Sequence, residues 1–233
     1  AFTYNDPVVF LEYAIDTAIA CRRREIRSVA VTAGYLLPAP RAELFAHLDA
    51  ANIDLKAFSE DFYRHVAMGS RAPVLGTIEY AHHETDVWIE LTTLLIPGYN
   101  DSDDEIAAIA SWVADKLSPD VPLHFTAFHP DYRMLEVPPT PRSTLRRARR
   151  LALEHGLHYV YTGNVFDLEG QRTSCPSCGS RLVERSWYSI EGYRLSPTGL
   201  CPTCGETIAG VFAGGPGQWG SRRLPVTMSG GRP

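Results

Sequence analysis

Several features that mark other classes of protein are missing from this sequence of 233 residues. No stretch approaches the roughly 18 consecutive apolar residues of a membrane-spanning helix, and no charged start followed by an apolar run indicates a signal peptide. Lys and Arg number 22 against 27 Asp and Glu, so the formal net charge is -5 and no overall positive field attracts nucleic acid or anionic lipid. We therefore expect a soluble, cytoplasmic protein with neither a nucleic-acid nor a membrane partner.

The common signatures of nucleotide-dependent and hydrolytic enzymes are also absent. The chain has no glycine-rich dinucleotide loop, no Walker phosphate loop, and no H-E-x-x-H or G-x-S-x-G motif. These absences weigh against ordinary hydride transfer, phosphoryl transfer and serine hydrolase chemistry. The composition itself is that of a globular protein, with 45% hydrophobic and 21% charged residues and enough apolar material for a sizeable core.

Cysteine is scarce but patterned, because four of the five cysteines form two C-x-x-C pairs. The pairs are Cys175-Pro-Ser-Cys178 and Cys201-Pro-Thr-Cys204, and a glycine follows each of them. This spacing is typical of a zinc ribbon, in which four thiolates close a tetrahedral shell around a structural zinc. A four-cysteine iron–sulfur site is the main rival, and disulfides or free thiols are the remaining alternative.

The stretch between the two pairs, residues 181–195, alternates in part between polar and apolar residues. It contains Glu191-Gly192 as a turn signal, so it predicts a hairpin that joins two zinc knuckles. We assign residues 169–213 to this four-cysteine module and expect residues 214–233, which are rich in glycine, to be a flexible tail.

Residues 1–168 alternate between predicted strands and helices. An Asn5-Asp6-Pro7 start predicts the first helix, and Ser102 with Glu105 predicts a capping box at the start of another. The strands are expected at residues 28–33, 52–56, 87–95, 123–128 and 158–162. This order implies parallel crossovers, hence a doubly wound sheet or a complete or partial barrel.

Polar residues follow strand after strand, at the end where barrel enzymes carry their sites. These residues are Asp6, Thr32, Asp54, Lys56, Thr92, Thr93, His129 and Asn164. The recurrence favours an enzyme.

An ordered set of short segments is more specific than any of these patterns. The set comprises Thr3-Tyr4-Asn5-Asp6-Pro7, Val31-Thr32-Ala33-Gly34-Tyr35, Asp54-Leu55-Lys56, residues 92–101, Phe128-His129-Pro130-Asp131-Tyr132 and Tyr161-Thr162-Gly163-Asn164-Val165. In this order the segments resemble the radical SAM enzymes of the AmmeMemoRadiSam system, which are similar to pyruvate formate-lyase activating enzyme. The resemblance runs from Phe2 to about Phe212.

The resemblance implies a partial (β/α) barrel of the TIM type that binds S-adenosylmethionine on a [4Fe–4S] cluster and generates a 5'-deoxyadenosyl radical. It also implies an electron donor such as ferredoxin or flavodoxin. The substrate it suggests is a glycyl-radical enzyme, and another protein or a small molecule stays open.

The same resemblance gives five residues a place around S-adenosylmethionine. Asp6 matches the position that accepts the methionyl ammonium. Thr32 matches the threonine of a T-N-G-type loop, in which Ala33 replaces the asparagine here. Asp54 and Lys56 match a D-x-K element whose acid and ammonium hold polar groups of the cofactor or pair with each other. His129 resembles a histidine near the ribose.

One departure from the family pattern concerns the cluster. Its three cysteines stand as C-x-x-x-C-x-x-C and leave one iron open, but this sequence contains no such triplet. Because the chain begins with Ala1, we expect it to be a C-terminal piece of a radical SAM enzyme that is inactive alone. A cluster-free, zinc-binding interaction protein on a degenerate barrel is the alternative from another class, and an unrelated α/β-barrel enzyme is a third.

Overall fold

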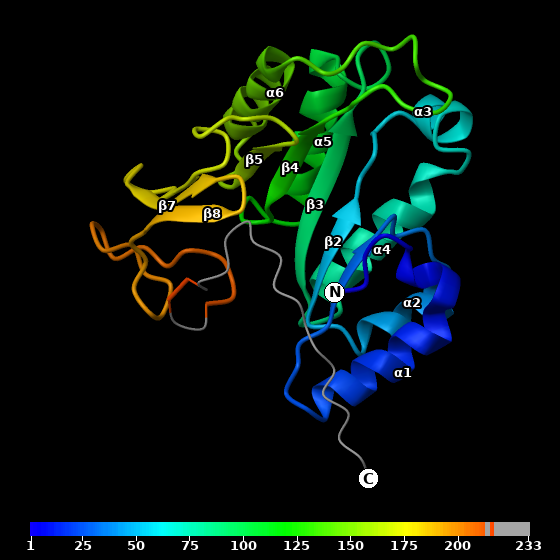
Figure 1. The fold of residues 1–233 in the computed structure, drawn as a ribbon, viewed down its shortest axis with the longest axis horizontal. Coiled ribbons are helices and arrows are strands. Elements are labelled where there is room, and N and C mark those ends of the chain that lie inside the picture. Colours follow the sequence, from blue (N-terminus) through cyan, green and yellow to red (C-terminus); the bar gives the residue numbers. More distant parts are fainter. Residues whose placement is uncertain (213–214, 217–233) are drawn as a thin grey trace.

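The computed structural model describes residues 1–212 and 215–216, and its largest element is a sheet of five parallel strands (Figure 1). The strands lie side by side in their sequence order, β1-β2-β3-β4-β5. Their bounds are Val29–Thr32 (β1), Ala50–Asp54 (β2), Trp88–Leu95 (β3), Leu123–Ala127 (β4) and Val160–Gly163 (β5). Parallel neighbours need crossover connections, and helices supply them here.

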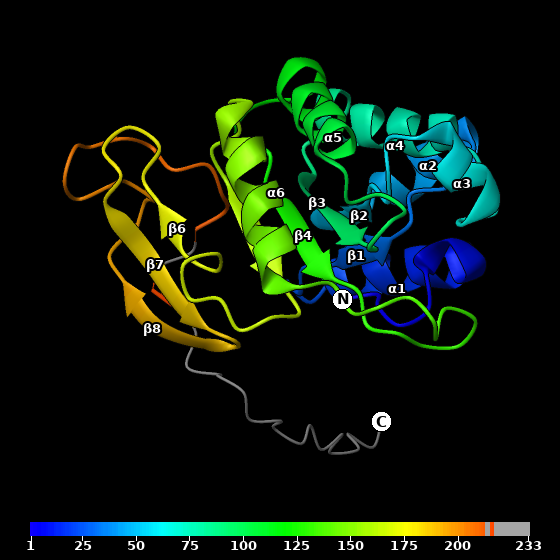
Figure 2. The ribbon, with the colours of Figure 1, turned by 90° about the horizontal axis from the view of Figure 1, so that it is seen from above.

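The helices cover one face of this sheet, with α4, α5 and α6 side by side along it (Figure 2). A 3-10 helix, η1, spans Pro7–Phe10; the α-helices are α1 (Leu11–Arg22), α2 (Pro38–Phe45), α3 (Glu60–His65), α4 (Arg71–His83), α5 (Asp103–Lys116) and α6 (Arg142–Glu154). The predicted α/β class with parallel strands is confirmed.

Alternate residues along the strands face opposite sides of the sheet. Ile53, Leu91 and Phe125 are fully buried in the core beneath the helices. The residues between them point to the other side and are only half-buried. We call this side the open face, and its polar members are Asn52, Asp54, Glu90, Thr92, His124, Thr126 and Tyr161.

The sheet of the described residues is open, because β1 and β5 lie at its two ends and do not pair with each other. The chain start adds one further parallel bridge at the outer edge of β1, between Phe2 and Ala30. The Phe2 amide donates to the Val29 carbonyl at 2.8 Å, and the Val31 amide donates to the Phe2 carbonyl at 2.9 Å. Closure into a barrel stays a prediction.

The second predicted strand is displaced toward the amino terminus, since β2 ends at Asp54 rather than at Lys56. Beyond Asp54 the backbone carbonyls no longer pair with the backbone of β3 and accept hydrogen bonds from side chains of β3 and of the loop after it instead. The Leu55 carbonyl accepts a hydrogen bond from Thr93 Oγ1 at 2.7 Å, and the Lys56 carbonyl accepts one from Asn100 Nδ2 at 2.7 Å. Lys56 therefore stands on the loop that follows the strand.

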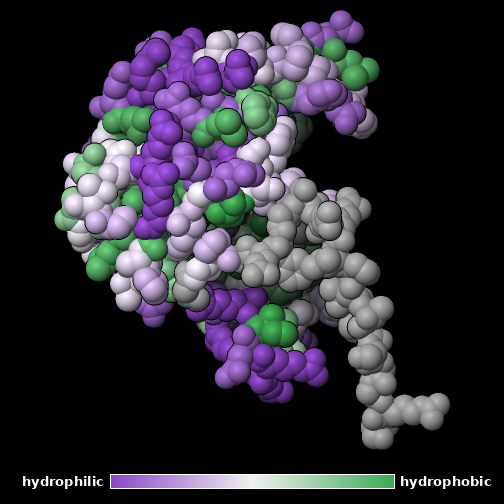
Figure 3. All heavy atoms as spheres, turned by 60° about the vertical axis from the view of Figure 1, so that its left-hand side comes forward, coloured by the Kyte–Doolittle hydropathy of each residue, from purple (hydrophilic) through white to green (hydrophobic). Residues whose placement is uncertain are grey.

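The four-cysteine module is a small antiparallel sheet beside the β5 end of the main sheet (Figures 1 and 2). Its strands are β6 (Thr173–Ser174), β7 (Arg181–Ser186) and β8 (Ser189–Tyr193), and its small core contains Tyr159, Leu182, Val183, Leu195 and Ile208. The face that carries the module is mostly hydrophilic, with hydrophobic residues in small separate patches (Figure 3). The domain boundary at residue 168 stays a prediction.

The expected hairpin is present, but its turn is not at Glu191-Gly192. The turn is formed by Trp187 and Tyr188, and Trp187 adopts a positive φ of 53°. Gly192 lies inside β8 opposite Glu184, whose carboxylate oxygen would be 3.0 Å from a Cβ at this position. The glycine therefore relieves a close cross-strand contact rather than forming the turn.

No helix of the described residues is long and apolar enough to cross a membrane. Apart from residues 215–216, the predicted tail at 214–233 falls outside the residues that the structure describes.

Candidate functional site

Asp6 joins the amino-terminal turn to the loop that follows β1. Its Oδ1 accepts hydrogen bonds from the Val8 amide at 3.1 Å and from Thr32 Oγ1 at 2.8 Å, and its Oδ2 accepts one from the Ala33 amide at 2.8 Å. The first of these bonds caps η1, as the Asn5-Asp6-Pro7 start predicts. A carboxylate has about four acceptor positions, so this half-buried group retains capacity for one more donor. The structure thus brings the predicted pair Asp6 and Thr32 into direct contact.

Asp54 and Lys56 form an ion pair at the carboxyl end of β2. Lys56 Nζ lies 2.8 Å from Asp54 Oδ2, and their side chains are 39% and 32% exposed. Beneath the pair, the hydroxyl of Tyr63 accepts a hydrogen bond from the Lys56 amide at 3.3 Å. Burial raises the pKa of Tyr63 to about 12, so this phenol stays neutral. Of the two roles open to the D-x-K element, the structure shows the mutual pairing.

His129 lies exposed on the loop after β4. Thr140 fixes the base of this loop, because its hydroxyl donates to the Leu95 carbonyl at 2.5 Å and accepts from the Phe128 amide at 3.0 Å. His129 itself makes no hydrogen bond within the described part of the chain. The predicted site residues therefore share the carboxyl edge of the sheet, but they form two separate contacts and one exposed ring rather than a single cluster.

Two side chains, Asn100 on the loop after β3 and Glu105 in the first turn of α5, hold this edge together. Asn100, 1% exposed, donates to the Lys56 carbonyl at 2.7 Å and the Leu94 carbonyl at 2.9 Å, and it accepts from the Ile96 amide at 2.7 Å. Glu105 accepts hydrogen bonds from the Phe58 and Ser59 amides.

The expected capping box is therefore only half present. The Ser102 hydroxyl accepts from the Glu105 amide at 3.2 Å, as predicted, but the Glu105 carboxylate binds the loop after β2 instead of the Ser102 amide.

The sequence did not predict a second polar group, which lies on the open face near the amino-terminal ends of β3 and β4. Glu90 accepts hydrogen bonds from the indole N–H of Trp88 at 3.2 Å and from His124 Nε2 at 2.8 Å. The His124 ring stacks on the ring of Tyr161, with centroids 5.1 Å apart. Burial raises the pKa of Glu90, but the hydrogen bond and charge of His124 outweigh it and lower that pKa overall. The available signal was the alternation of Trp88, Glu90 and Thr92 within an otherwise apolar strand.

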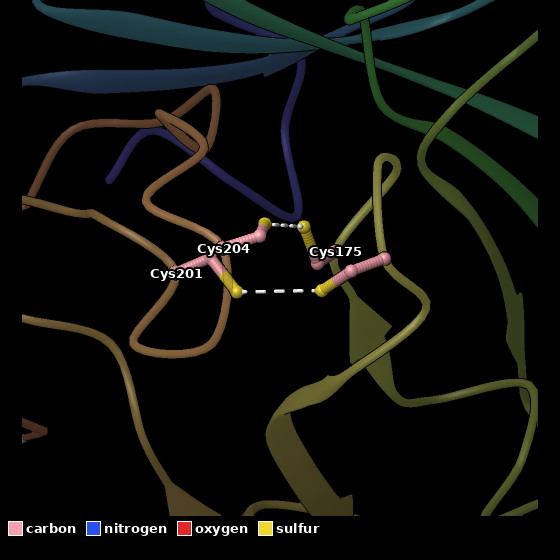
Figure 4. Close-up of side chains that lie close together, drawn as sticks. Cys175, Cys201 and Cys204 are labelled. Atoms are coloured by element: carbon pink, nitrogen blue, oxygen red, sulfur yellow. Dashed lines mark hydrogen bonds between the residues drawn. The ribbon is translucent and has the colours of Figure 1, made fainter.

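The four module cysteines converge as their spacing predicts (Figure 4). Their sulfurs all lie within 4.8 Å of one another, with Cys175 and Cys204 3.5 Å apart and Cys178 and Cys201 3.7 Å apart. Metal–sulfur bonds of about 2.3 Å in a tetrahedron separate the sulfurs by about 3.8 Å, so this set fits one tetrahedral ion. The four cysteines are therefore a candidate metal centre.

Tight turns position these thiols, and hydrogen bonds affect their pKa values. Gly179 and Gly205 follow the pairs with positive φ values of 71° and 80°. Each amide donates back to the first cysteine of its pair at 2.9 Å. Hydrogen bonding from Ser180 lowers the pKa of the Cys178 thiol to about 6. The residue types and turns suit thiolate coordination, whereas the fifth cysteine, Cys21, stands alone in α1.

The amino-terminal part of the chain, which contains most of the carboxyl edge, matches a known family. Residues 1–110, which include Asp6, Thr32, Asp54 and Lys56, match the radical SAM superfamily. The chain is also 42% identical over 209 residues to an uncharacterized protein of Methanocaldococcus jannaschii. That alignment covers 89% of this chain and 62% of the relative, so the chain spans less than two thirds of its length.

Two solved structures share the fold. A domain of pyruvate-formate lyase-activating enzyme from Bacteroides vulgatus matches with a TM-score of 0.61 and 18% identity over 70% of this chain and 97% of that one. A radical SAM methyltransferase from Sphaerobacter thermophilus matches with a TM-score of 0.54 and 14% identity over 76% and 52% of the two chains. The predicted similarity of the fold to that of a pyruvate-formate lyase-activating enzyme is thus confirmed.

Proposed function

We propose that this chain supplies the S-adenosylmethionine-binding edge of a radical SAM enzyme. The observation that carries the proposal is the Asp6 carboxylate, which Thr32 and Ala33 hold at the carboxyl edge of a sheet whose sequence matches the superfamily. A half-buried carboxylate with a free acceptor position suits the ammonium group of the cofactor.

The remaining residues are assigned by their chemistry and place. Asp54 and Lys56 form a charged pair on the same edge, and each can exchange its partner for a polar group of the cofactor. His129 is exposed on the neighbouring loop, where its ring can contact the ribose. S-adenosylmethionine supplies a 5'-deoxyadenosyl radical when a reduced cluster cleaves it, and the residues of this chain bind and orient it.

The cluster does not fit the cysteines of this chain. The sequence holds no C-x-x-x-C-x-x-C, and the four module cysteines form a closed set that leaves no ligand position open. Ligands for an open cluster iron therefore have to come from outside these 233 residues. The activating-enzyme likeness supports a protein substrate such as a glycyl-radical enzyme, with ferredoxin or flavodoxin as electron donor.

Binding of S-adenosylmethionine tests the assignment in the native-length protein, loaded with iron and sulfide without oxygen. Asp6→Asn and His129→Ala should each raise the Kd for S-adenosylmethionine about tenfold, since each removes a charged or polar contact. Asp115→Asn is the matched control, because Asp115 is an exposed acid in the last turn of α5, at the other end of this helix from the carboxyl edge. Unchanged affinity in both edge variants would remove the assignment.

We propose zinc for the four-cysteine centre. Four sulfurs at tetrahedral separations are the donor set of structural zinc sites, which stabilise the folded module. Cys178→Ser should abolish zinc binding and lower the thermal midpoint of the module. Cys21→Ser, the control, should keep the zinc. Full zinc content and an unchanged midpoint in Cys178→Ser would contradict the proposal.

A cluster-free interaction protein is the second candidate, favoured by the missing cysteine triplet beside an intact four-cysteine set. Metal analysis of the protein purified from its source without oxygen separates the two candidates. About four irons and one zinc per chain support the radical enzyme, whereas one zinc without iron supports the interaction protein.

A further inference from the structure

A cavity of about 500 Å³ lies between the open face and the four-cysteine module. The sheet contributes Trp88 and Glu90 from β3, His124 from β4 and Tyr161 from β5. Residues of the module close it from the other side. The volume falls within the range of about 300–1,000 Å³ that is usual for small-molecule sites.

This cavity is distinct from the candidate cofactor edge. Trp88 is the first residue of β3, and two further lining residues, Pro122 and Tyr159, directly precede β4 and β5. On the sheet side, the cavity therefore lies toward the amino-terminal ends of β3 and β4. None of the residues assigned to S-adenosylmethionine lines it, because those residues follow the carboxyl ends.

The negative charge in the cavity is already paired. Glu90 receives the indole N–H of Trp88 and the imidazole of His124, so both hydrogen bonds of this carboxylate stay within the protein. Consequently Glu90 does not require a cationic ligand.

The positive charge in the cavity, that of Arg185, forms no ion pair within the described residues. Arg185, on β7, is half-buried and donates through Nη1 to the Gln171 carbonyl at 3.0 Å and to Thr173 Oγ1 at 2.9 Å. Within residues 1–212 and 215–216 no carboxylate lies within ion-pair distance of it. Its charge lowers the pKa of Glu90 across the cavity, but the hydrogen bonds of that carboxylate go to Trp88 and His124. A partly buried guanidinium that has only neutral acceptors is a favourable partner for an anion.

Aromatic and aliphatic groups form the rest of the wall. The guanidinium carbon of Arg185 lies 5.8 Å from the centre of the Tyr161 ring, which stacks on His124 on the sheet side. Phe212 and Leu195 also line the cavity. A planar apolar group gains contact with these rings while an acidic group reaches the arginine.

We propose that this cavity binds a small aromatic carboxylate, whose carboxylate pairs with Arg185 and whose ring packs against Tyr161 and Phe212. The site needs neither S-adenosylmethionine nor a cluster, so it stands independently of the proposed radical chemistry.

The probe that tests the site is 3-phenylpropionate, and 3-phenylpropionamide is its uncharged analogue. The readout is the indole N–H resonance of Trp88 in the zinc-loaded 233-residue chain, assigned with Trp88→Phe. Because this N–H lies in the cavity wall, a ligand that enters shifts it. We expect a saturable shift with a millimolar Kd for the acid, as is usual for a fragment of this size.

Arg185→Gln should weaken the binding of 3-phenylpropionate at least about tenfold. The substitution removes the positive charge, while the new amide can still donate to the Gln171 carbonyl. Arg181→Gln is the matched control on the same strand, since Arg181 pairs with Glu184 and does not line the cavity. In the wild type, the amide should bind at least about tenfold more weakly than the acid.

Three results would overturn the proposal: no saturable shift with the acid, equal affinity of Arg185→Gln, or equal affinity of acid and amide. The comparison of acid and amide uses the unmodified chain, so it decides the matter even if Arg185→Gln fails to fold.

Discussion

Asn100 offers the sharpest test of how the carboxyl edge is held together. The side chain is 1% exposed and makes three hydrogen bonds to the backbone, two as donor to the carbonyls of Lys56 and Leu94 and one as acceptor from the Ile96 amide. Asn100→Ala leaves these buried groups without partners. Each bond contributes about 1 kcal/mol net, so the free energy of unfolding should fall by about 3 kcal/mol.

Asn100→Asp separates hydrogen bonding from shape. The aspartate keeps the volume and the acceptor for the Ile96 amide. Its second carboxylate oxygen, however, faces the Lys56 and Leu94 carbonyl oxygens, to which the asparagine amide donates. We expect it to be at least as destabilising as Asn100→Ala at pH 7. Urea denaturation, analysed through the midpoint and slope, measures both changes.

Asp101→Ala is the control for this pair of variants. Asp101 accepts from the Gly98 amide at 2.8 Å in an exposed turn, so water can replace it and the loss should stay below about 1 kcal/mol. The reasoning fails if Asn100→Ala loses less than about 1 kcal/mol or if Asn100→Asp is as stable as the wild type.

Two further predictions concern the region around β5 and the open face. A Cβ at Gly170 would lie 2.0 Å from Thr162 Oγ1, so Gly170→Ala should lower the free energy of unfolding by about 2 kcal/mol. At Gly76 in α4 the nearest atom to a Cβ would be 3.4 Å away, so Gly76→Ala should raise the free energy of unfolding by about 0.5 kcal/mol. Urea midpoints decide this, and equal values for the two variants would refute the packing argument. The lowered pKa of Glu90 in the folded chain means that its charge stabilises the fold above the ordinary value of 4.5, and this contribution disappears as the pH falls through the lowered pKa. The stability advantage of the wild type over Glu90→Gln should therefore shrink as the pH falls below the ordinary value of 4.5, and a difference that does not vary with pH would contradict it.

Local sequence signals predicted the elements well where the cause is local. The capping carboxylate of Asp6 and the hydroxyl of Ser102 begin helices where the sequence places them. Each C-x-x-C pair with its following glycine forms its own turn, because the glycine adopts the positive φ that closes it. These interactions span only two to four residues, so both partners can be recognised in a short stretch of sequence.

Signals that depend on distant partners were misread. Glu105 has the right spacing for a capping box, yet its carboxylate binds the amides of Phe58 and Ser59, which are 46 or 47 residues away. Gly192 looked like a turn residue, but the strand opposite it, with Glu184, explains why a glycine stands there. In both cases a residue distant in the sequence determines the role of the side chain or glycine, which the local pattern could not predict.

The alternation of strands and helices, the convergence of four cysteines and the resemblance to radical SAM enzymes could all be read from the sequence. The contact of Asp6 with Thr32, the ion pair of Asp54 with Lys56 and the position of Arg185 at the cavity beside the sheet could not. Periodicity assigns a residue to a face of its strand, whereas the register between strands and the packing of the module select its partner on that face.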